Sequence, residues 1–288
     1  MLMTVEYALN WVHQQCEHAD LFYGHGTDNA WDEACFLVLT VAELPMDADE
    51  SVLANTLTQA QSQRIQTLTE QRIATRNPLP YLLNEAWFAG MKFYVDERVL
   101  VPRSPLAEVI EDQCQPWCQP EKVTRILDLC TGSGCIAIAL AKAFPHAQVD
   151  ATDLSFEALV VAEKNRQLHG VQAQLTLYQA DVFEGLPQQH YDIIVSNPPY
   201  VDAEDFASMP EEFQQEPEMG LSSGADGLDV TRRILAQAKS YLSEQGVLII
   251  EVGNSWPALE TAYPQLPFTW LEFAHGGYGV FLLTREAL

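Results

Sequence analysis

The chain of 288 residues is 48% hydrophobic, which is enough for one large domain and a smaller one. It contains no apolar run near the roughly 20 residues that span a bilayer, and residues 1–15 lack the basic start of a signal peptide. Its 40 acidic and 15 basic residues give a net charge of −25, which disfavours binding to nucleic-acid phosphates and favours a basic macromolecular partner. Plain solubility or a salt-adapted host would also account for such a charge.

Six cysteines are spread over the chain, and without a secretory signal we expect reduced thiols in a cytoplasmic protein. They are Cys16, Cys35, Cys114, Cys118, Cys130 and Cys135. The pair Cys114 and Cys118 lacks the third cysteine of an iron–sulfur radical enzyme. His13, Cys16 and His18 are of metal-ligand type, but on a helix His18 points away from the other two. The sequence therefore predicts no metal site.

Helical patterns dominate the first hundred residues. The predicted helices cover residues 5–18, 29–41 and 51–74. Thr27 or Asp28 is a suitable cap for the second helix, and the prolines at 78 and 80 end the third. Residues 87–95 are typical of a hairpin that turns at Ala89–Gly90. We expect residues 1–100 to form a separate, mostly helical domain.

Strands and helices alternate after residue 100. The predicted strands cover residues 124–129, 147–152, 173–179, 191–196, 246–252, 268–273 and 278–284. The predicted helices cover residues 105–112, 134–144, 155–168, 229–244 and 256–262. This alternation predicts an α/β domain over residues 101–288, with a mostly parallel seven-stranded sheet and helices on both faces. The last two strands are joined by too few residues for a crossover helix, so they must pair antiparallel.

A glycine-rich loop follows the first of these strands, with Gly132 and Gly134 allowing a tight turn and close approach of a ligand to the next helix. Asp153 closes the second strand, where a carboxylate can accept both hydroxyls of a ribose. Asp181 closes the third strand, followed by Val182 and Phe183, which are placed to border an adenine ring. The pattern predicts a cofactor that contains adenosine.

Two cofactors are compatible with this pattern, because the loop also matches G-x-G-x-x-A, the nicotinamide-dinucleotide fingerprint. Asp128 distinguishes them, since it places a carboxylate inside the first strand. A pyrophosphate would avoid that charge, whereas the ammonium and sulfonium groups of S-adenosylmethionine would tolerate it. Bracing the loop is an alternative role for Asp128 with either cofactor.

The sequence Asn197-Pro198-Pro199-Tyr200 follows the fourth strand, at the edge where open α/β sheets bind ligands. The side-chain oxygen of Asn197 and the carbonyl of Pro198 are two acceptors for the hydrogens of an –NH₂ group. Pro199 keeps Pro198 extended, neither proline has an N–H, and Tyr200 offers an aromatic wall. A polar loop with a Pro-Pro turn is the alternative. A hydride-transfer enzyme does not need this motif.

With these motifs assembled, the chain resembles the class I S-adenosylmethionine-dependent methyltransferases. Within them it is similar, over nearly its whole length, to the protein N(5)-glutamine methyltransferases, and among these to the enzymes that modify large-subunit ribosomal protein L-three. The stretches that carry this resemblance cover residues 23–29, 101–105, 200–205 and 268–273. The resemblance implies a substrate-recognition domain over residues 1–100 and a methyltransferase domain over residues 101–288.

The same resemblance implies S-adenosylmethionine as cofactor and a basic ribosomal protein as substrate, free or within an assembling large subunit, with no direct DNA binding and no membrane. We expect catalysis by Asn197, Pro198, Pro199 and Tyr200. We expect the cofactor to be bound by Asp128, Cys130, Thr131, Gly132, Ser133, Gly134, Asp153, Asp181, Val182 and Asn197.

Two residues depart from the family pattern. Cys130 stands where many methyltransferases have glycine, which predicts an ordinary backbone conformation there. Val182 stands where release-factor relatives have tryptophan beside adenine. Two further features stay open. The loop at 216–227 is a lid over the cofactor or a surface connection, and Arg103 contacts a ligand or pairs with an acid.

Three other functions are alternatives to glutamine methylation of a ribosomal protein. Methylation of a release-factor glutamine would use the same chemistry. Methylation of a nucleic-acid adenine needs a basic groove, and the sequence offers only the adjacent pair Arg232–Arg233. A non-catalytic assembly factor would not need the intact Asn197, Gly132, Gly134 and Asp153.

Overall fold

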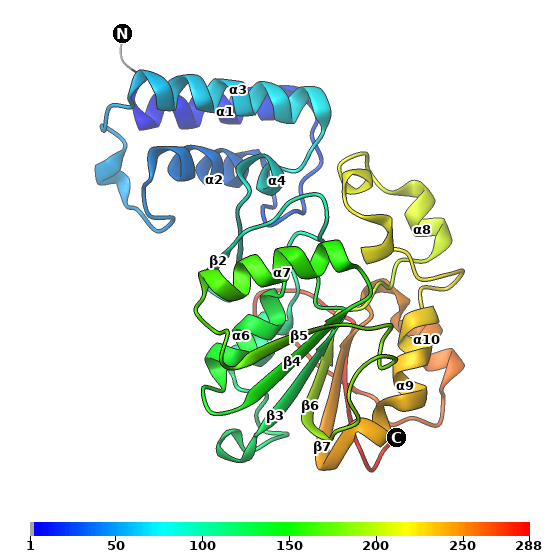
Figure 1. The fold of residues 1–288 in the computed structure, drawn as a ribbon. Helices are drawn as coiled ribbons and strands as arrows, with labels where there is room; N and C mark the ends of the chain where they lie inside the picture. Colours follow the sequence, from blue (N-terminus) through cyan, green and yellow to red (C-terminus); the bar gives the residue numbers. More distant parts are fainter. Residues whose placement is uncertain (1–2) are drawn as a thin grey trace. The chain divides into compact units, whose positions relative to one another are not determined.

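The computed structural model describes residues 3–288 and divides the chain into two compact units (Figure 1). The first unit runs to Glu85 and also includes Pro210–Gln215, and the second comprises Ala86–Met209 and Glu216–Leu288. The boundary lies at Glu85 and not near residue 100, because the hairpin side chains Phe88 and Phe93 are part of the second unit's core. No helix in the described part of the chain is long and apolar enough to cross a membrane.

The first unit is helical, as its sequence pattern predicts. Its elements are α1 (Val5–His18), α2 (Ala30–Ala42), the short 3₁₀ turn η1 (Glu50–Val52), α3 (Gln59–Thr75) and α4 (Leu79–Leu83). The predicted cap of α2 was wrong, because Asn29 accepts the backbone N–H of Asp32 at 3.0 Å. The predicted start of α3 was wrong too. Thr58 and Gln61 form a capping box that begins the helix at Gln59.

A buried ion-pair cluster holds the segment Pro210–Gln215 in this unit. Arg72 on α3 is only 2% exposed, and its Nε lies 2.7 Å from Oε1 of Glu33 on α2. Glu212 lies 3.7 Å from the same guanidinium, pairs with Arg76 at 3.2 Å, and accepts the backbone N–H of Phe22 at 3.0 Å. Because a buried guanidinium needs compensating charge, the helical unit is complete only with Glu212.

The second unit is an α/β domain, which confirms the predicted fold class. Its strands are β1 (Ala86–Phe88), β2 (Met91–Phe93), β3 (Arg125–Leu129), β4 (Gln148–Asp153), β5 (Leu175–Gln179), β6 (Tyr191–Ser196), β7 (Leu242–Glu251), β8 (Thr269–Trp270) and β9 (Val280–Thr284). The hairpin β1–β2 is separate from the sheet, whose order is β5-β4-β3-β6-β7-β9-β8. The first five strands of that order are parallel, and β9 pairs antiparallel with both β7 and β8, as expected.

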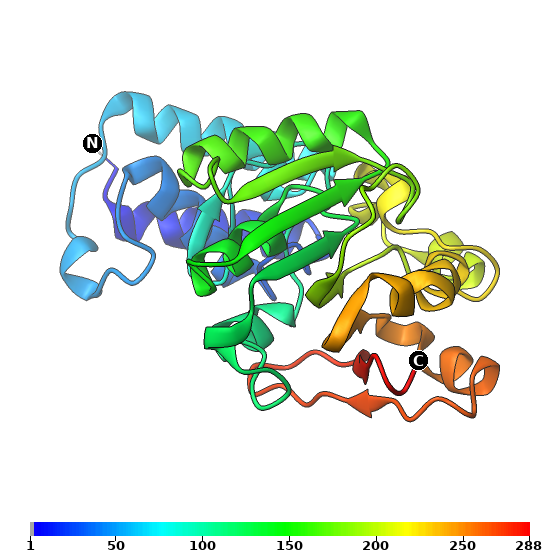
Figure 2. The same cartoon turned by 60° about the horizontal axis from the view of Figure 1, so that its bottom comes forward.

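Helices cover both faces of the sheet. The helices of this unit are α5 (Leu106–Glu111), α6 (Cys135–Ala143), α7 (Phe156–Leu168), α8 (Ala203–Ser208), α9 (Asp229–Tyr241) and α10 (Trp256–Ala262). The apolar core under α5 and α6 lies on one face, and the core under α9 and α10 lies on the other. Figure 2 shows β3, β4 and β5 side by side with their arrowheads at one edge.

The strand register brings the predicted motifs to that edge. Leu129 at the end of β3 pairs with Thr152 on β4 and with Ser196 on β6. The residues that follow these three are Cys130, Asp153 and Asn197. The order of the sheet also changes direction at β3, between β4 and β6, and such a switch point is where open α/β sheets bind ligands.

Replacing Glu212 tests the ion-pair cluster. Because Glu212→Ala leaves a buried guanidinium without one of its carboxylates, we expect the free energy of unfolding to fall by about 3 kcal/mol. Urea denaturation followed by circular dichroism measures the change. Glu211→Ala, at the exposed neighbouring position, is the control and should have almost no effect. Equal stability of the two variants would contradict the role given to Glu212.

Candidate active site

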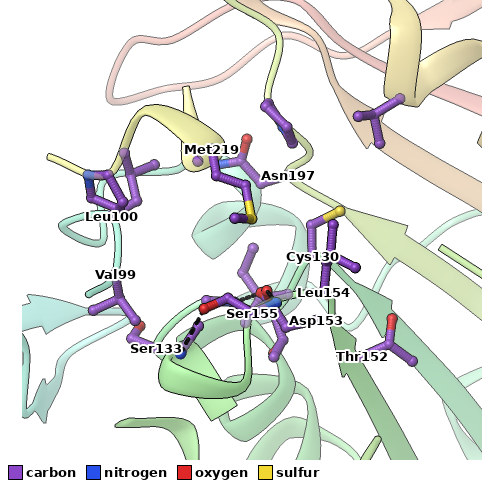
Figure 3. A pocket seen from close by; sticks show the side chains of 18 of the residues that line it. Val99, Leu100, Cys130, Ser133, Thr152, Asp153, Leu154, Ser155, Asn197 and Met219 are labelled. Atoms are coloured by element: carbon purple, nitrogen blue, oxygen red, sulfur yellow. Dashed lines mark hydrogen bonds between the residues drawn. The ribbon is translucent and has the colours of Figure 1, made fainter. Parts of the chain in front are cut away.

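A cavity of about 300 Å³ lies at the carboxyl edge of the sheet in the second unit (Figure 3). Most of the residues that we expect to bind a cofactor line this cavity, and so does Pro199 of the predicted catalytic motif. They are Cys130, Thr131, Gly132, Ser133, Asp153, Asp181, Val182, Asn197 and Pro199. Figure 3 shows Asn197 and Met219 on one side of the cavity and Ser133, Asp153 and Ser155 on the other.

Asp128 does not line the cavity but organises the loop that does. It is fully buried, and its Oδ2 accepts hydrogen bonds from Thr131 Oγ1 at 2.6 Å and from the backbone N–H of Ala137 at 3.1 Å. Ala137 is the third residue of α6, whose cap position is Gly134, a residue without a side chain. Asp128 therefore supplies the capping oxygen that Gly134 lacks.

The second oxygen of Asp128 is buried and has no hydrogen-bond partner among the described residues. A buried carboxylate oxygen in this state is costly unless a donor reaches it. Burial is also the main reason why the pKa of Asp128 is raised to about 7, with the charge of Asp153 adding to the effect. The brace predicted as the alternative role is thus present, and it leaves one oxygen of Asp128 without a donor among the described residues.

The glycine loop and Asp153 form the floor of the cavity. The backbone N–H of Gly132 donates to Asp153 Oδ2 at 2.8 Å, and that of Ser155 donates to Oδ1 at 2.9 Å. Gly132 has a φ of +53°, and a Cβ there would meet nothing within 4 Å. Burial raises the pKa of Asp153, which these backbone donors partly offset. The carboxylate is therefore held in place at the end of β4.

Two residues of this cavity adopt backbone conformations that the sequence did not predict. Cys130 has a φ of +60°, so the expectation of an ordinary conformation there was wrong. Val182 has a φ of +59°, which is unusual for a β-branched residue. Cys130 directly follows β3, Val182 lies in the turn after β5, and both residues line the cavity. Strained backbone of this kind is concentrated at ligand sites, because only the surrounding fold maintains it.

The Asn-Pro-Pro-Tyr motif begins directly after β6. Ser196 anchors its start by donating to the carbonyl of Leu129 at 2.8 Å. Asn197 is partly exposed in the cavity, and its side chain makes no hydrogen bond to any residue that the structure describes. Pro198 is buried and does not line the cavity. Tyr200 also lies outside the lining, because its hydroxyl donates to Glu251 Oε1 at 2.9 Å.

Part of the loop at 216–227 borders the cavity, where Pro217, Met219, Gly220 and Ser222 contribute to the wall. Glu216 fixes the start of this loop by a bidentate ion pair with Arg103, with N–O distances of 2.9 and 2.6 Å. It also accepts the backbone N–H of Val101 at 3.0 Å. Of the roles left open for Arg103, pairing with an acid is therefore the one observed.

Asp181 and Arg233 form a further pair on the cavity wall, with 2.8 Å between Arg233 Nη1 and Asp181 Oδ1. The sequence interpretation missed Arg233, whose place on α9 after a long loop gave no local signal. It was wrong about Phe183, which is 1% exposed and stacks on Tyr241 with ring centroids 4.4 Å apart. Leu154 is a second missed residue, since it is 52% exposed beside Asp153 and lines the cavity.

The residues at this cavity are suited to a cationic adenosine compound. Asp153 ends β4 where a ribose is bound in such folds, Asp181 and Leu154 offer a carboxylate and an apolar surface, and Asp128 adds a carboxylate buried next to the glycine loop. Within residues 3–288, no group of three or more His, Cys, Asp or Glu side chains could hold a metal ion.

Solved structures share this fold. The hMettl16 catalytic domain in complex with a MAT2A 3′UTR hairpin has a TM-score of 0.51 and 18% identity, covering 79% of this chain and 81% of its own. The T. thermophilus 16S rRNA methyltransferase RsmC, in complex with AdoMet and guanosine, has a TM-score of 0.50 and 21% identity, covering 69% of this chain and 49% of its own. The model of the methyltransferase small domain matches residues 116–225. Fold and site therefore define a class I methyltransferase.

Curated relatives narrow this class. The ribosomal protein uL3 glutamine methyltransferases of Neisseria meningitidis serogroup A and Neisseria gonorrhoeae are each 48% identical to this chain over 288 residues. The alignments cover 100% of this chain and 95% and 96% of those proteins. This chain belongs to the family of ribosomal protein uL3 glutamine methyltransferases.

The positive φ of Cys130 has a measurable consequence. Because glycine adopts this conformation without strain, Cys130→Gly should be more stable than Cys130→Ala by about 1 kcal/mol. At Cys135, the first residue of α6, the order should reverse, since alanine favours a helix more than glycine does. Urea denaturation of the four variants tests both orders. The same order at both positions would contradict the left-handed conformation at Cys130.

Proposed function

We propose that this protein transfers a methyl group from S-adenosylmethionine to the side-chain amide nitrogen of a glutamine in ribosomal protein uL3. The observation that carries the proposal is the place of Asn197, whose side chain has no protein partner and faces the cavity that the glycine loop and Asp153 also line. The full-length similarity to uL3 glutamine methyltransferases supports the substrate.

The cofactor would be held by three carboxylates and the glycine loop. The negative charge of Asp128, buried next to the loop, would attract its ammonium group, and Asp153 is a suitable acceptor for its ribose hydroxyls. Asp181 and Val182 would border the adenine, with Arg233 fixing Asp181. When bound, S-adenosylmethionine supplies an electrophilic methyl group on a sulfonium.

The protein's contribution to the reaction is to orient the amide nitrogen. That nitrogen is a poor nucleophile because its lone pair is delocalised into the carbonyl. Asn197 Oδ1 and the carbonyl of Pro198 would accept hydrogen bonds from the two N–H groups of the amide and aim its nitrogen at the cavity. Such orientation lowers the activation free energy by several kcal/mol. Positive charge develops on the nitrogen during transfer, so the same acceptors stabilise the transition state more than the ground state. The proton leaves afterwards, which requires no general base.

The negative net charge of this protein favours a basic partner. A net charge of −25 attracts a basic ribosomal protein and repels nucleic acid, so association should weaken with salt. The helical unit, with its own core of α1, α2 and α3, is the proposed substrate-recognition domain. The proposed setting is the cytoplasm, on free uL3 or on an assembling large subunit.

Asn197→Ala tests the assignment of the amide clamp. Because one of the two acceptors is lost, we expect turnover to fall about a hundredfold or more while cofactor affinity changes only a few-fold. Incubation with radiolabelled S-adenosylmethionine and isolated ribosomal proteins or immature subunits measures turnover, and calorimetry measures binding. Gln172→Ala, an exposed change in the second unit away from the cavity lining, is the control. Label in RNA, or only in an added release factor, would overturn the substrate, and weak binding with normal turnover would overturn the role of Asn197.

Asp128→Asn separates the two roles of Asp128, which are to hold the loop by hydrogen bonds and to supply a negative charge. The amide oxygen of Asn can still accept from Thr131 and Ala137, so the loop should stay folded. Because the negative charge that attracts the ammonium group is lost, cofactor affinity at pH 8 should fall about tenfold or more.

The pKa of Asp128 gives this change a pH signature. The ionised form binds the cation, and a pKa of about 7 means that its population falls as pH decreases from 8 to 6. The wild-type affinity should therefore weaken several-fold over this range, whereas that of Asp128→Asn should not. Asp150→Asn, on the same β4 strand but outside the cavity lining, is the matched control and should keep the wild-type profile. A flat wild-type profile would contradict the role of Asp128.

A further inference from the structure

Tyr200 ends the catalytic motif, and its hydroxyl donates a hydrogen bond of 2.9 Å to Oε1 of Glu251. Glu251 is the last residue of β7, the strand next to β6, and is 5% exposed. Its other oxygen, Oε2, accepts from Ser104 Oγ at 2.5 Å. Ser104 lines the cavity. One buried carboxylate thus connects the motif to a second residue of the cavity lining.

The remainder of Tyr200 is held at two further points. Its ring packs so closely against Gly253 that a Cβ there would lie 2.5 Å from Cε2. Its carbonyl accepts from Ser255 Oγ at 2.7 Å, and a Cβ at Gly227 would lie 2.1 Å from that carbonyl oxygen. Ring, hydroxyl and carbonyl are therefore all fixed. The motif is anchored at one end by Ser196 and at the other by Tyr200.

We propose that Glu251 is a positioning residue for methyl transfer, which holds the hydroxyl of Tyr200 and thereby fixes the acceptors of Asn197 and Pro198. The inference rests on the proposed function, because the group to be oriented is the glutamine amide. Two rigid prolines separate Tyr200 from Asn197, so a displacement of Tyr200 is transmitted along the motif and not absorbed by it. A small misplacement of an orienting group has a large effect on rate.

Glu251 accepts from two hydroxyls, as an ionised carboxylate does. Burial raises its pKa, whereas the hydrogen bonds from Ser104 and Tyr200 and the charge of Arg103 lower it. Arg103 is itself paired with Glu216. A glutamine at position 251 would keep an acceptor for Tyr200 and could donate to Ser104, so it is the conservative variant.

A second tyrosine–carboxylate pair in the same sheet is the matched control. The hydroxyl of Tyr191 donates to Asp150 Oδ2 at 2.9 Å, the same length as the Tyr200–Glu251 bond. Tyr191 and Asp150 are both buried, near the amino ends of β6 and β4, and neither lines the cavity. Tyr191→Phe therefore removes a tyrosine–carboxylate hydrogen bond of the same length, together with the one that the hydroxyl accepts from Gln189, without touching the motif.

The experiment compares Glu251→Ala, Glu251→Gln, Tyr200→Phe and the double variant of Glu251→Ala with Tyr200→Phe. Each single loss should lower kcat about tenfold or more with cofactor affinity within a few-fold of wild type, and the double variant should be no slower than the slower single one. Glu251→Gln should recover most of kcat. Tyr191→Phe should lower thermal stability as Tyr200→Phe does and leave kcat within about twofold. Tyr200→Phe keeps the ring on Gly253, so it tests the proposal even if Glu251→Ala does not fold.

A wild-type kcat in Tyr200→Phe, losses that multiply in the double variant, or an equal loss in Tyr191→Phe would overturn the inference. A second measurement does not depend on the substrate. The side-chain amide signals of Asn197 in ¹⁵N NMR, identified by their absence in Asn197→Ala, should shift in Tyr200→Phe but not in Tyr191→Phe. If the wild-type enzyme labels no glutamine, the proposed function fails, and these signals still decide whether Glu251 positions the motif.

Discussion

A single buried carboxylate determines the geometry of the cavity. Asp128 lies in β3, the middle one of the five parallel strands, and one of its oxygens holds both Thr131 in the loop and the first turn of α6 at Ala137. Gly134 at the cap position allows α6 to approach α7, where a Cβ would lie 3.2 Å from that of Ala162, but it offers no capping oxygen. The strand, the loop and the helix therefore depend on one side chain, which leaves an acceptor directed to no protein group.

Buried carboxylates hold other parts of the cavity in the same way. Glu216 fixes the loop at 216–227 to Arg103 and Val101, and Glu251 joins Tyr200 to Ser104. The chain has far more acidic than basic residues, and most of the excess is solvated. The buried acids are different because each accepts two or more hydrogen bonds, which is what makes their burial tolerable. These carboxylates connect loops that follow different strands of the sheet.

The elements that the sequence predicted well are those determined by local pattern. The helix at Val5–His18 and the strand at Tyr191–Ser196 have the bounds expected, because capping and apolar periodicity act within a few residues. The edge location of Asp153 and Asn197 follows from parallel strand topology alone. The start of α3 failed because the capping box at Thr58 prevailed over the apolar spacing of Leu53 and Leu57.

What the sequence could not predict depends on tertiary contacts. The left-handed backbone at Cys130 contradicts the local preference of cysteine and is imposed by the loop around it. Arg233 reaches Asp181 across 52 positions of sequence. Phe183 follows a predicted cofactor residue, yet it packs under α9 because Tyr241 is there to stack on it.

The segment Pro210–Gln215 has a consequence for the order in which the chain folds. On the ribosome, domains generally fold as they emerge, the N-terminal one first. Here the N-terminal helices emerge long before Glu212, which compensates the charge of Arg72 in their core. The helical unit therefore lacks the contacts of Glu212 with Arg76 and Phe22 until strands β1 to β6 of the second unit have been synthesised. The unit that begins the polypeptide is thus completed only by a segment that emerges after β6 of the second unit.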